Sequence, residues 1–269
     1  MIAVVDYQKG NLKSVERGLI AAGGKAFITA DASEIAKADA IVLPGVGAFA
    51  DAAATMCELG QMEVIRERVR AGVPFLGICL GEHLMFEHGV EGAPEGNPAC
   101  GLGLLPGTVV AMPRYDEQGK AFKVPHVGWN TIEMPACNGG AAIPPCGEGG
   151  GNAVLSSGGV GGGAARSSAA KRGLFEHGAF LDSTPQPGSD LAFACPLFDG
   201  IAPGEYFYFT HSYIAPTGSH TIAETTHSVR FTSAVQFGER AFGVQFHPEK
   251  SSDAGARVLA NFVTIAARG

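Results

Sequence analysis

The sequence predicts an α/β protein with a mostly parallel central sheet flanked by helices, a small antiparallel β annex and a glycine-rich insertion. Short aliphatic runs alternate with helical patterns from residue 2 to residue 80, which is typical of strand–helix–strand units with right-handed crossovers. The second half of the chain, from Val109 to Phe246, carries short strands separated by turn signals. Between them, a stretch after residue 135 is rich in Gly, Ala and Ser and poor in large apolar residues.

The first elements follow from hydrophobic periodicity. Residues 11–22 place Leu12, Val15 and Leu19 on one side and end at Gly23, as a helix with a glycine C-terminus should. Loops at the carboxyl ends of parallel strands are where ligands bind. The predicted elements are, in order, a strand at Ile2–Val5, a helix at 11–22, a strand at Ala40–Leu43, helical pattern at 49–71 and a strand at Phe75–Ile78.

The second half changes character. Turn residues such as Gly238-Glu239-Arg240 separate short strands, and residues 254–267 place Val258, Leu259 and Phe262 on one amphipathic stripe, which predicts a closing helix. The strands are predicted at Val109–Met112, Ile132–Met134, Tyr206–Phe209, Thr221–Thr225, Ala234–Phe237 and Phe242–Phe246.

We interpret the 269 residues as a single domain with a low-complexity surface insertion at residues 136–191. Glycine runs in the insertion do not form a phosphate-binding loop, because no strand precedes them and no Lys-Ser or Lys-Thr follows. Leu174 and Phe175 could hold a short helix there. Deletion of about residues 139–172 is expected to leave the activity of the domain nearly intact.

Composition excludes several classes of function. A net charge of −7 and a pI near 5.6 argue against nucleic acid as the main partner. No apolar run approaches the roughly 18 residues of a membrane span, and the N-terminus lacks the basic region of a secretory signal, so we expect a cytoplasmic protein. The six cysteines show no CxxC spacing, which predicts neither a disulfide framework nor a zinc site.

Cys79 lies where the predicted strand meets the next helix, in Gly77-Ile78-Cys79-Leu80-Gly81. Glycines two residues away on either side permit the strained turn of a nucleophile elbow. The helix behind it should direct N–H groups at the sulfur and lower the thiol pKa. Taken alone, this cysteine could equally be an inert core thiol.

His247 and Glu249 supply the other groups that a cysteine nucleophile needs. They lie two residues apart in Phe246-His247-Pro248-Glu249, so in an extended segment both side chains could face one way. His247 would take the thiol proton and Glu249 would fix the imidazole. A metal site of His247 with His126 and His211 is not supported by ligand spacing, and no cofactor is predicted.

The sequence resembles the class I (triad) glutamine amidotransferases, which have a flavodoxin-like α/β fold, and within them the glutaminase subunits of imidazole glycerol phosphate synthase. The elbow and His-Pro-Glu are marks of the superfamily, whereas the two stretches 124–130 and 249–252 are marks of this branch. The resemblance covers residue 1 to about 135 and about 195 to 269. Its motifs are Asp6-Tyr7 with Gly10-Asn11-Leu12, Leu43 to Phe49, Gly77 to Gly81, Val124-Pro125-His126-Val127-Gly128-Trp129-Asn130, Phe209 to Tyr213 and Phe242 to Ser252.

The resemblance implies that Cys79 attacks the side-chain amide of glutamine and that water then hydrolyses the thioester. Backbone N–H groups would bind the oxyanion, one from Leu80 and one from the loop Gly45-Val46-Gly47, whose peptide can reorient. The backbone of His211, Ser212 and Tyr213 would hold the amino-acid end of glutamine.

The resemblance also implies a partner, because ammonia released into water would be protonated and lost. This partner is a (β/α)8-barrel cyclase subunit that uses the ammonia to make imidazole glycerol phosphate and an aminoimidazole carboxamide ribotide. Asn11, Trp129, Tyr208 and Lys250 match family positions near that interface, and Trp and Tyr are favoured contact residues. Trp129 could alternatively fill the core.

The sequence departs from the family beside the nucleophile, where Glu82-His83 replace the usual apolar residue and Gln. His83 can replace the donor or the acceptor of that Gln, though not both in one geometry. Glu82 should oppose the thiolate unless solvent screens it. A second departure is Gln8-Lys9, before Gly10. Another triad glutaminase or γ-glutamyl hydrolase, and a non-catalytic regulatory partner, remain alternative functions.

Overall fold

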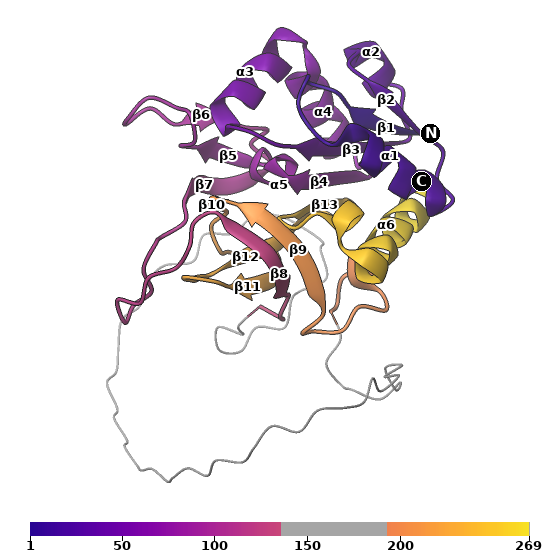
Figure 1. The fold of residues 1–269 in the computed structure, drawn as a ribbon. Coiled ribbons are helices and arrows are strands. Elements are labelled where there is room, and N and C mark those ends of the chain that lie inside the picture. The colour runs from indigo at the N-terminus through magenta and orange to yellow at the C-terminus, as the bar shows by residue number, and fades with distance from the viewer. Residues whose placement is uncertain (136–192, 269) are drawn as a thin grey trace, which may run out of the picture. The chain divides into compact units, whose positions relative to one another are not determined.

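The computed structural model describes residues 1–135 and 193–268, and a seven-stranded sheet forms its centre (Figure 1). The strand order is β11–β12–β13–β4–β3–β1–β2. Strands β13, β4, β3, β1 and β2 run parallel, and β12 and β11 extend the sheet as an antiparallel edge, so the predicted mostly parallel sheet is confirmed. The strands are β1 Ile2–Val5, β2 Ala26–Thr29, β3 Ala40–Gly45, β4 Phe75–Cys79, β11 Thr221–Thr226, β12 Arg230–Phe237 and β13 Ala241–Val244.

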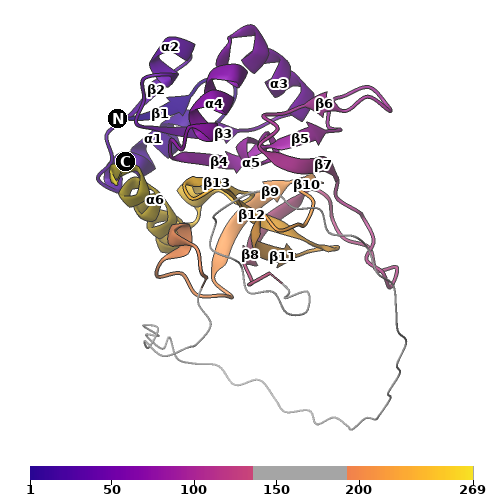
Figure 2. The same cartoon turned by 180° about the vertical axis from the view of Figure 1, so that it is seen from behind.

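Helices cover both faces of the sheet, as the two opposite views show (Figures 1 and 2). One face packs against α1 (Leu12–Ala21) and α6 (Ser252–Ala267) through Leu19, Leu259 and Phe262. The other packs against α2 (Ala32–Ile35), α3 (Phe49–Glu58) and α4 (Gln61–Arg70). Strands β1, β3 and β4 are buried on both faces, which explains their continuous apolar runs.

Two smaller β structures adjoin the central sheet. A four-stranded sheet has the order β10–β7–β5–β6, and its β5–β7 pair is parallel, so it is mixed rather than purely antiparallel as predicted. Strands β8 and β9 form an antiparallel two-stranded ribbon. The remaining elements are α5 Leu80–His83, β5 Phe86–Gly89, β6 Ala99–Cys100, β7 Leu105–Ala111, β8 His126–Thr131, η1 Pro196–Phe198, β9 Tyr206–His211, β10 Tyr213–Ile214 and η2 Pro248–Lys250.

Some predicted boundaries are wrong for identifiable reasons. The helical pattern at 49–71 is two helices, because Gly60 has a left-handed φ of 66° that ends the first. The strand predicted at Ile132–Met134 lies earlier, at His126–Thr131, and Glu133 makes only an isolated bridge to Glu224. Strand β2 was not predicted; its apolar run Ala26-Phe27-Ile28 is short, and three of its four residues are only half-buried.

The predicted insertion at residues 136–191, with Leu174 and Phe175, lies outside the described residues. Within residues 1–135 and 193–268, the four cysteines 57, 79, 100 and 195 are free. No helix of these ranges combines the length and the apolar character that crossing a membrane requires.

Candidate active site

Cys79 ends strand β4 in a strained backbone conformation, with φ 54° and ψ −107°. The flanking glycines are required by close backbone contacts. A Cβ at Gly81 would lie 1.8 Å from the carbonyl oxygen of Leu43, and one at Gly77 would lie 2.5 Å from that of Gly81. The turn therefore has the form of a nucleophile elbow, with α5 starting directly behind the sulfur.

The thiol of Cys79 is almost completely buried. Its Sγ lies 3.8 Å from the carbonyl oxygen of Thr210 and 3.7 Å from Nε2 of Gln245. Burial, and secondarily the charge of Glu82, raise the pKa of the Cys79 thiol to about 12, although the N–H of Leu80 acts in the opposite direction. The predicted lowering of this pKa is therefore wrong, because α5 has only four residues and burial dominates. In the absence of substrate, Cys79 is a thiol.

His247 and Glu249 form a buried pair, with 3.0 Å between His247 Nδ1 and Glu249 Oε1. Pro248 to Lys250 form the 3₁₀ turn η2 rather than the extended segment that was predicted. Two further bonds hold the histidine backbone: Tyr208 O accepts from His247 N–H at 2.9 Å, and Ser251 Oγ donates to His247 O at 2.6 Å. His247 Nε2 is buried and has no hydrogen-bond partner among the described residues.

Sheet register brings these residues to one edge. Strand β13 pairs with β4 in parallel, Val244 opposite Ile78, so both chains leave the sheet at the same edge, one to Cys79 and the other to His247. On the other side of β4, Gly45 of β3 lies opposite Cys79. The candidate oxyanion loop Gly45-Val46-Gly47 therefore begins beside the thiol, and Gly47 has a φ of 97°.

Glu82 lies in α5, and its side chain is fully buried. Neither carboxyl oxygen has a hydrogen-bond partner among residues 1–135 and 193–268. A Cβ at Gly243 would lie 2.8 Å from Glu82 Cγ, so the side chain packs against β13. Burial raises the pKa of Glu82 well above its ordinary value. Solvent does not screen this carboxyl, and it is accommodated as the neutral acid.

His83 is also buried, and its Nε2 lies 2.6 Å from Oε1 of Gln245. Burial lowers the pKa of His83 to about 4, so the ring is neutral and Nε2–H is the donor to that oxygen. This bond orients the Gln245 amide with its NH₂ group toward Cys79 Sγ. No role was predicted for Gln245, although it lies two residues before His247 within the motif 242–252.

The segment predicted to hold glutamine joins β9 to β10: His211 ends β9, and Tyr213 starts β10. The carbonyl of Thr210 beside Cys79 Sγ places this segment next to the thiol. Ser212 O accepts a hydrogen bond from Met112 N–H at 2.8 Å, which ties the segment to the chain after β7.

Three of the four residues predicted at the partner interface gather on the β8–β9 ribbon and η2. Trp129 and Tyr208 are directly opposite in the ribbon, with ring centroids 6.0 Å apart. Lys250 Nζ lies 5.9 Å from the centroid of the Tyr208 ring. Trp129 is 50% exposed, so it does not fill the core. Asn11 lies on a separate element, as the residue preceding α1.

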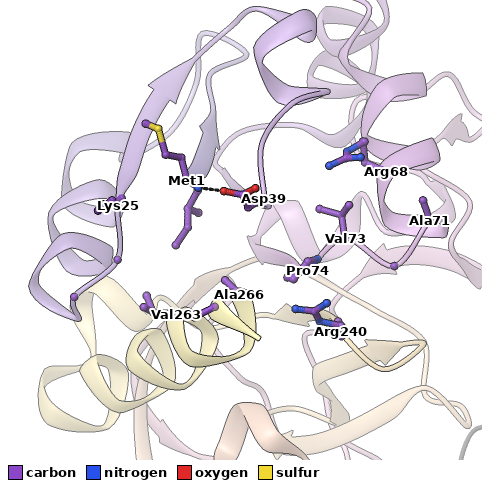
Figure 3. Close-up of a pocket in the computed structure, with 15 residues that line it drawn as sticks. Met1, Lys25, Asp39, Arg68, Ala71, Val73, Pro74, Arg240, Val263 and Ala266 are labelled. Carbon is purple, nitrogen blue, oxygen red and sulfur yellow. Dashed lines mark hydrogen bonds and ion pairs between the residues drawn. The ribbon is translucent and has the colours of Figure 1, made fainter. Parts of the chain in front are cut away.

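A cavity of about 680 Å³ lies at the opposite edge of the sheet, next to the residues that precede or begin the parallel strands (Figure 3). Its lining includes no predicted site residue. Two arginine side chains of the lining donate hydrogen bonds to backbone carbonyl groups: Arg68 to Ala38 O at 2.8 Å and Arg240 to Ile265 O at 2.7 Å. Asp39 pairs with the N-terminal amine of Met1. These charges stabilise loop and helix ends.

Comparison with known families agrees with this geometry. The model of the glutamine amidotransferase class-I family matches residues 3–136 and 164–266, so the chain belongs to this family of enzymes. The match resumes at residue 164, earlier than the resemblance drawn from the motifs, and it omits only residues 137–163 between its two parts.

Relatives with a closely similar sequence include subunits of one enzyme, and the similarity extends over nearly the whole chain. The chain is 36% identical to the imidazole glycerol phosphate synthase subunit HisH of Moorella thermoacetica over 97% of this chain and 93% of that protein. It is 33% identical to the HisH subunit of Syntrophotalea carbinolica over 97% of this chain and 98% of that protein.

Solved structures show the same fold at low identity. The crystal structure of a glutamine amidotransferase has a TM-score of 0.58 and 15% identity, covering 99% of this chain and 98% of that one. The glutaminase domain of Trypanosoma brucei CTPS has a TM-score of 0.54 and 13% identity, covering 99% and 93% of the two chains. The fold is that of the class I glutamine amidotransferases.

Proposed function

We propose that the chain hydrolyses glutamine to glutamate and ammonia and passes the ammonia to a cyclase that makes imidazole glycerol phosphate in histidine biosynthesis. The observation that carries the first part is the position of Cys79, in a strained elbow at the same sheet edge as the His247–Glu249 pair. Similarity to HisH subunits over 97% of the chain supports the second part.

In this proposal His247 Nε2 takes the proton of the Cys79 thiol as Sγ attacks the amide carbon of glutamine. Because the thiol pKa is about 12, proton transfer and attack must be coupled rather than start from a stored thiolate. Glu249 holds Nδ1–H of His247 at 3.0 Å and stabilises the imidazolium. His247 then donates the proton to the leaving nitrogen, ammonia departs, and water hydrolyses the thioester to glutamate.

The oxyanion of the tetrahedral intermediate lies against backbone donors in this proposal. Leu80 N–H, directly after the nucleophile, is one donor. The peptide of the Gly45-Val46-Gly47 loop is the other, since Gly45 lies beside Cys79 in the sheet and glycine permits reorientation. The side-chain amide of Gln245, which His83 orients, directs an N–H group at Sγ of Cys79 rather than at the oxyanion.

The ammonia acceptor docks on the β8–β9 ribbon in this proposal. The ribbon exposes Val127, Trp129 and Tyr206, and an aromatic, partly apolar surface with Lys250 beside it suits a protein interface. Backbone bonding links this surface to the catalytic histidine directly, since Tyr208 O accepts from His247 N–H. Docking of the cyclase there encloses the route that ammonia takes away from Cys79.

Glutamate release by the purified chain, alone and with a cyclase subunit and its nucleotide substrate, tests the proposal. We expect slow release that rises sharply when both are added. Cys79→Ala should abolish release, and Glu249→Gln should reduce it about a thousandfold or more. Release that is equal with and without the partner would support the alternative of a free-standing glutaminase or γ-glutamyl hydrolase. No release under any condition would support a non-catalytic partner.

A further inference from the structure

A chain of hydrogen bonds joins three side chains behind the segment that is proposed to hold glutamine. His126 Nδ1 lies 3.0 Å from His211 Nε2, and His211 Nδ1 lies 2.8 Å from the carbonyl oxygen of Tyr213. At the other end, Asn130 Nδ2 lies 3.3 Å from His126 Nε2. His126 and His211 are 5% and 6% exposed and are directly opposite in the β8–β9 ribbon.

The partners at the two ends assign the direction of every bond. Asn130 Nδ2 donates to Thr226 O at 2.9 Å while its Oδ1 accepts from Thr131 N–H at 2.9 Å, so the amide orientation is unambiguous. Asn130 therefore donates to His126 Nε2, and the proton of His126 is on Nδ1. Starting from Tyr213 O, which can only accept, His211 also carries its proton on Nδ1 and accepts at Nε2 from His126.

Both assignments agree, and both rings are neutral Nδ1–H tautomers. Burial lowers the pKa of His126 to about 4 and the pKa of His211 well below its ordinary value. The other titratable groups facing the pair are His83 and His227, and the His227 ring stacks on His126 at 4.2 Å. A proton added to either ring would break one of these hydrogen bonds, because every ring nitrogen already has a partner and no acceptor among these residues is left for the new proton.

We propose that Asn130 and His126 are positioning residues that hold His211, and through its bond to Tyr213 the glutamine-binding segment 211–213, in the conformation that binds substrate. This inference rests on the proposed function for the role of that segment. Residues 126 and 130 lie on the inner side of β8, and Val127 and Trp129 lie exposed on the other side. Together, these bonds attach the segment to the β8–β9 ribbon and to the end of β11.

The tautomers can be tested without any reference to activity. We expect ¹⁵N-histidine NMR of the full chain near neutral pH to show His126 and His211 as neutral Nδ1–H rings, each assigned from its His→Gln variant. An Nε2–H or an imidazolium form at either residue would overturn the proposal. This measurement tests the hydrogen-bond relay, that is, the chain of bonds from Asn130 through His126 and His211 to Tyr213 O, even if the protein releases no glutamate.

The positioning role is tested by glutamine affinity. In the Cys79→Ala background, where there is no turnover, we expect His126→Phe to raise the glutamine Kd about tenfold, since the aromatic shape remains but both nitrogens are lost. His126→Gln keeps one donor and one acceptor and should restore most of the affinity. With Cys79 present, KM should rise in His126→Phe and kcat should change less than about twofold.

His88→Gln serves as the matched control, because His88 lies on β5 outside the relay and half-exposed. Its Kd for glutamine should equal that of the parent. An unchanged Kd in His126→Phe, in a protein with the parental melting temperature, would show that the relay does not position the segment. Absence of glutamate release from the parent protein would instead count against the proposed function.

Discussion

Glu82 is the residue at which this chain departs most from what a nucleophile elbow requires. A carboxyl group beside a cysteine nucleophile opposes the thiolate when it is charged. In this structure it is fully buried without a hydrogen-bond partner in the described ranges, so the fold accepts it only when it is protonated. Proton loss from Glu82 therefore destabilises both the thiolate and the fold.

Glu82→Met is expected to stabilise the protein at neutral pH by about 1 to 3 kcal/mol. The folded pKa of Glu82 is raised, so the unfolded chain ionises first, near the ordinary value of 4.5. The free energy of unfolding of the parent then falls as pH rises above that value, by at most about 1.4 kcal/mol per pH unit. Urea unfolding between about pH 4 and pH 8 should show the difference between variant and parent growing with pH.

Glu67→Gln, at an exposed glutamate of α4, provides the control and should change little at any pH. A Glu82→Met difference that is constant or shrinks with rising pH would contradict the burial of an uncompensated carboxyl.

The raised pKa of Cys79 has its own consequence for alkylation. We expect the rate of iodoacetamide labelling of Cys79, in the absence of glutamine, to rise about tenfold per pH unit from about pH 6 to about pH 9 without a plateau. Labelling is followed by mass spectrometry of the Cys79 peptide. The exposed Cys57 is the internal control. A plateau below about pH 8 would mean that the resting protein already holds a thiolate.

At the scale of elements, the junction of β4 and α5 depends on backbone contact rather than on side chains. Gly81→Ala introduces a Cβ 1.8 Å from Leu43 O, so we expect a loss of about 3 kcal/mol or more in unfolding free energy. Gly72→Ala is the matched control: its φ is 87°, but no atom lies within 4 Å of the added Cβ. It should cost only about 1 to 2 kcal/mol. Equal losses in chemical denaturation would mean that the contact with Leu43 is not the constraint.

The β8–β9 ribbon presents Trp129 beside Tyr208 on its exposed side. We expect Trp129→Ala to weaken binding of the cyclase subunit by about 2 kcal/mol, roughly thirtyfold in Kd, measured by calorimetry. Tyr115→Ala removes another exposed aromatic residue, which lies outside the ribbon, and should leave Kd unchanged. Similar Kd values for parent and Trp129→Ala would place the partner on another surface.

Sequence patterns predicted the elements well where one face of a strand or helix is continuously apolar. Strands β1, β3 and β4 and helices α1 and α6 were found for this reason. Strand β2 was missed because its apolar run is only three residues long, in keeping with its position as a partly exposed edge strand. Strand β8 was misplaced, and with it the pairing of His126 with His211, because register between segments 85 residues apart is a property of the folded ribbon.

The candidate site was predictable where a motif carries its own chemistry. Cys79, His247 and Glu249 were predicted as nucleophile, base and orienting carboxylate from residue types and spacing alone. Three features of the site were not predicted: the raised pKa of the Cys79 thiol, the burial of Glu82 and the hydrogen bond from His83 to Gln245. Each depends on what packs against α5. In particular, the contact of Gln245 with the thiol follows only from the position of its side-chain amide between His83 of α5 and Cys79 of β4.

On the scale of the whole molecule, the family match omits residues 137–163. We therefore expect that replacing these residues with a short Gly-Ser linker leaves glutamate release within about twofold of the parent, since insertions outside a conserved domain are usually tolerated. Release is measured with the cyclase subunit present, and thermal melting of the isolated variant checks its folding. An insoluble or inactive product would show that the segment is part of the domain.

We propose that glutamine hydrolysis at Cys79 feeds a partner with ammonia that does not mix with solvent. The direct measurement uses glutamine labelled with ¹⁵N in the side-chain amide, together with the cyclase subunit, its nucleotide substrate and an excess of unlabelled ammonium ion. We predict that the imidazole product carries far more ¹⁵N label than the bulk ammonia does, and that Cys79→Ala abolishes this labelling. A label diluted to the isotopic ratio of the bulk ammonia would contradict the claim.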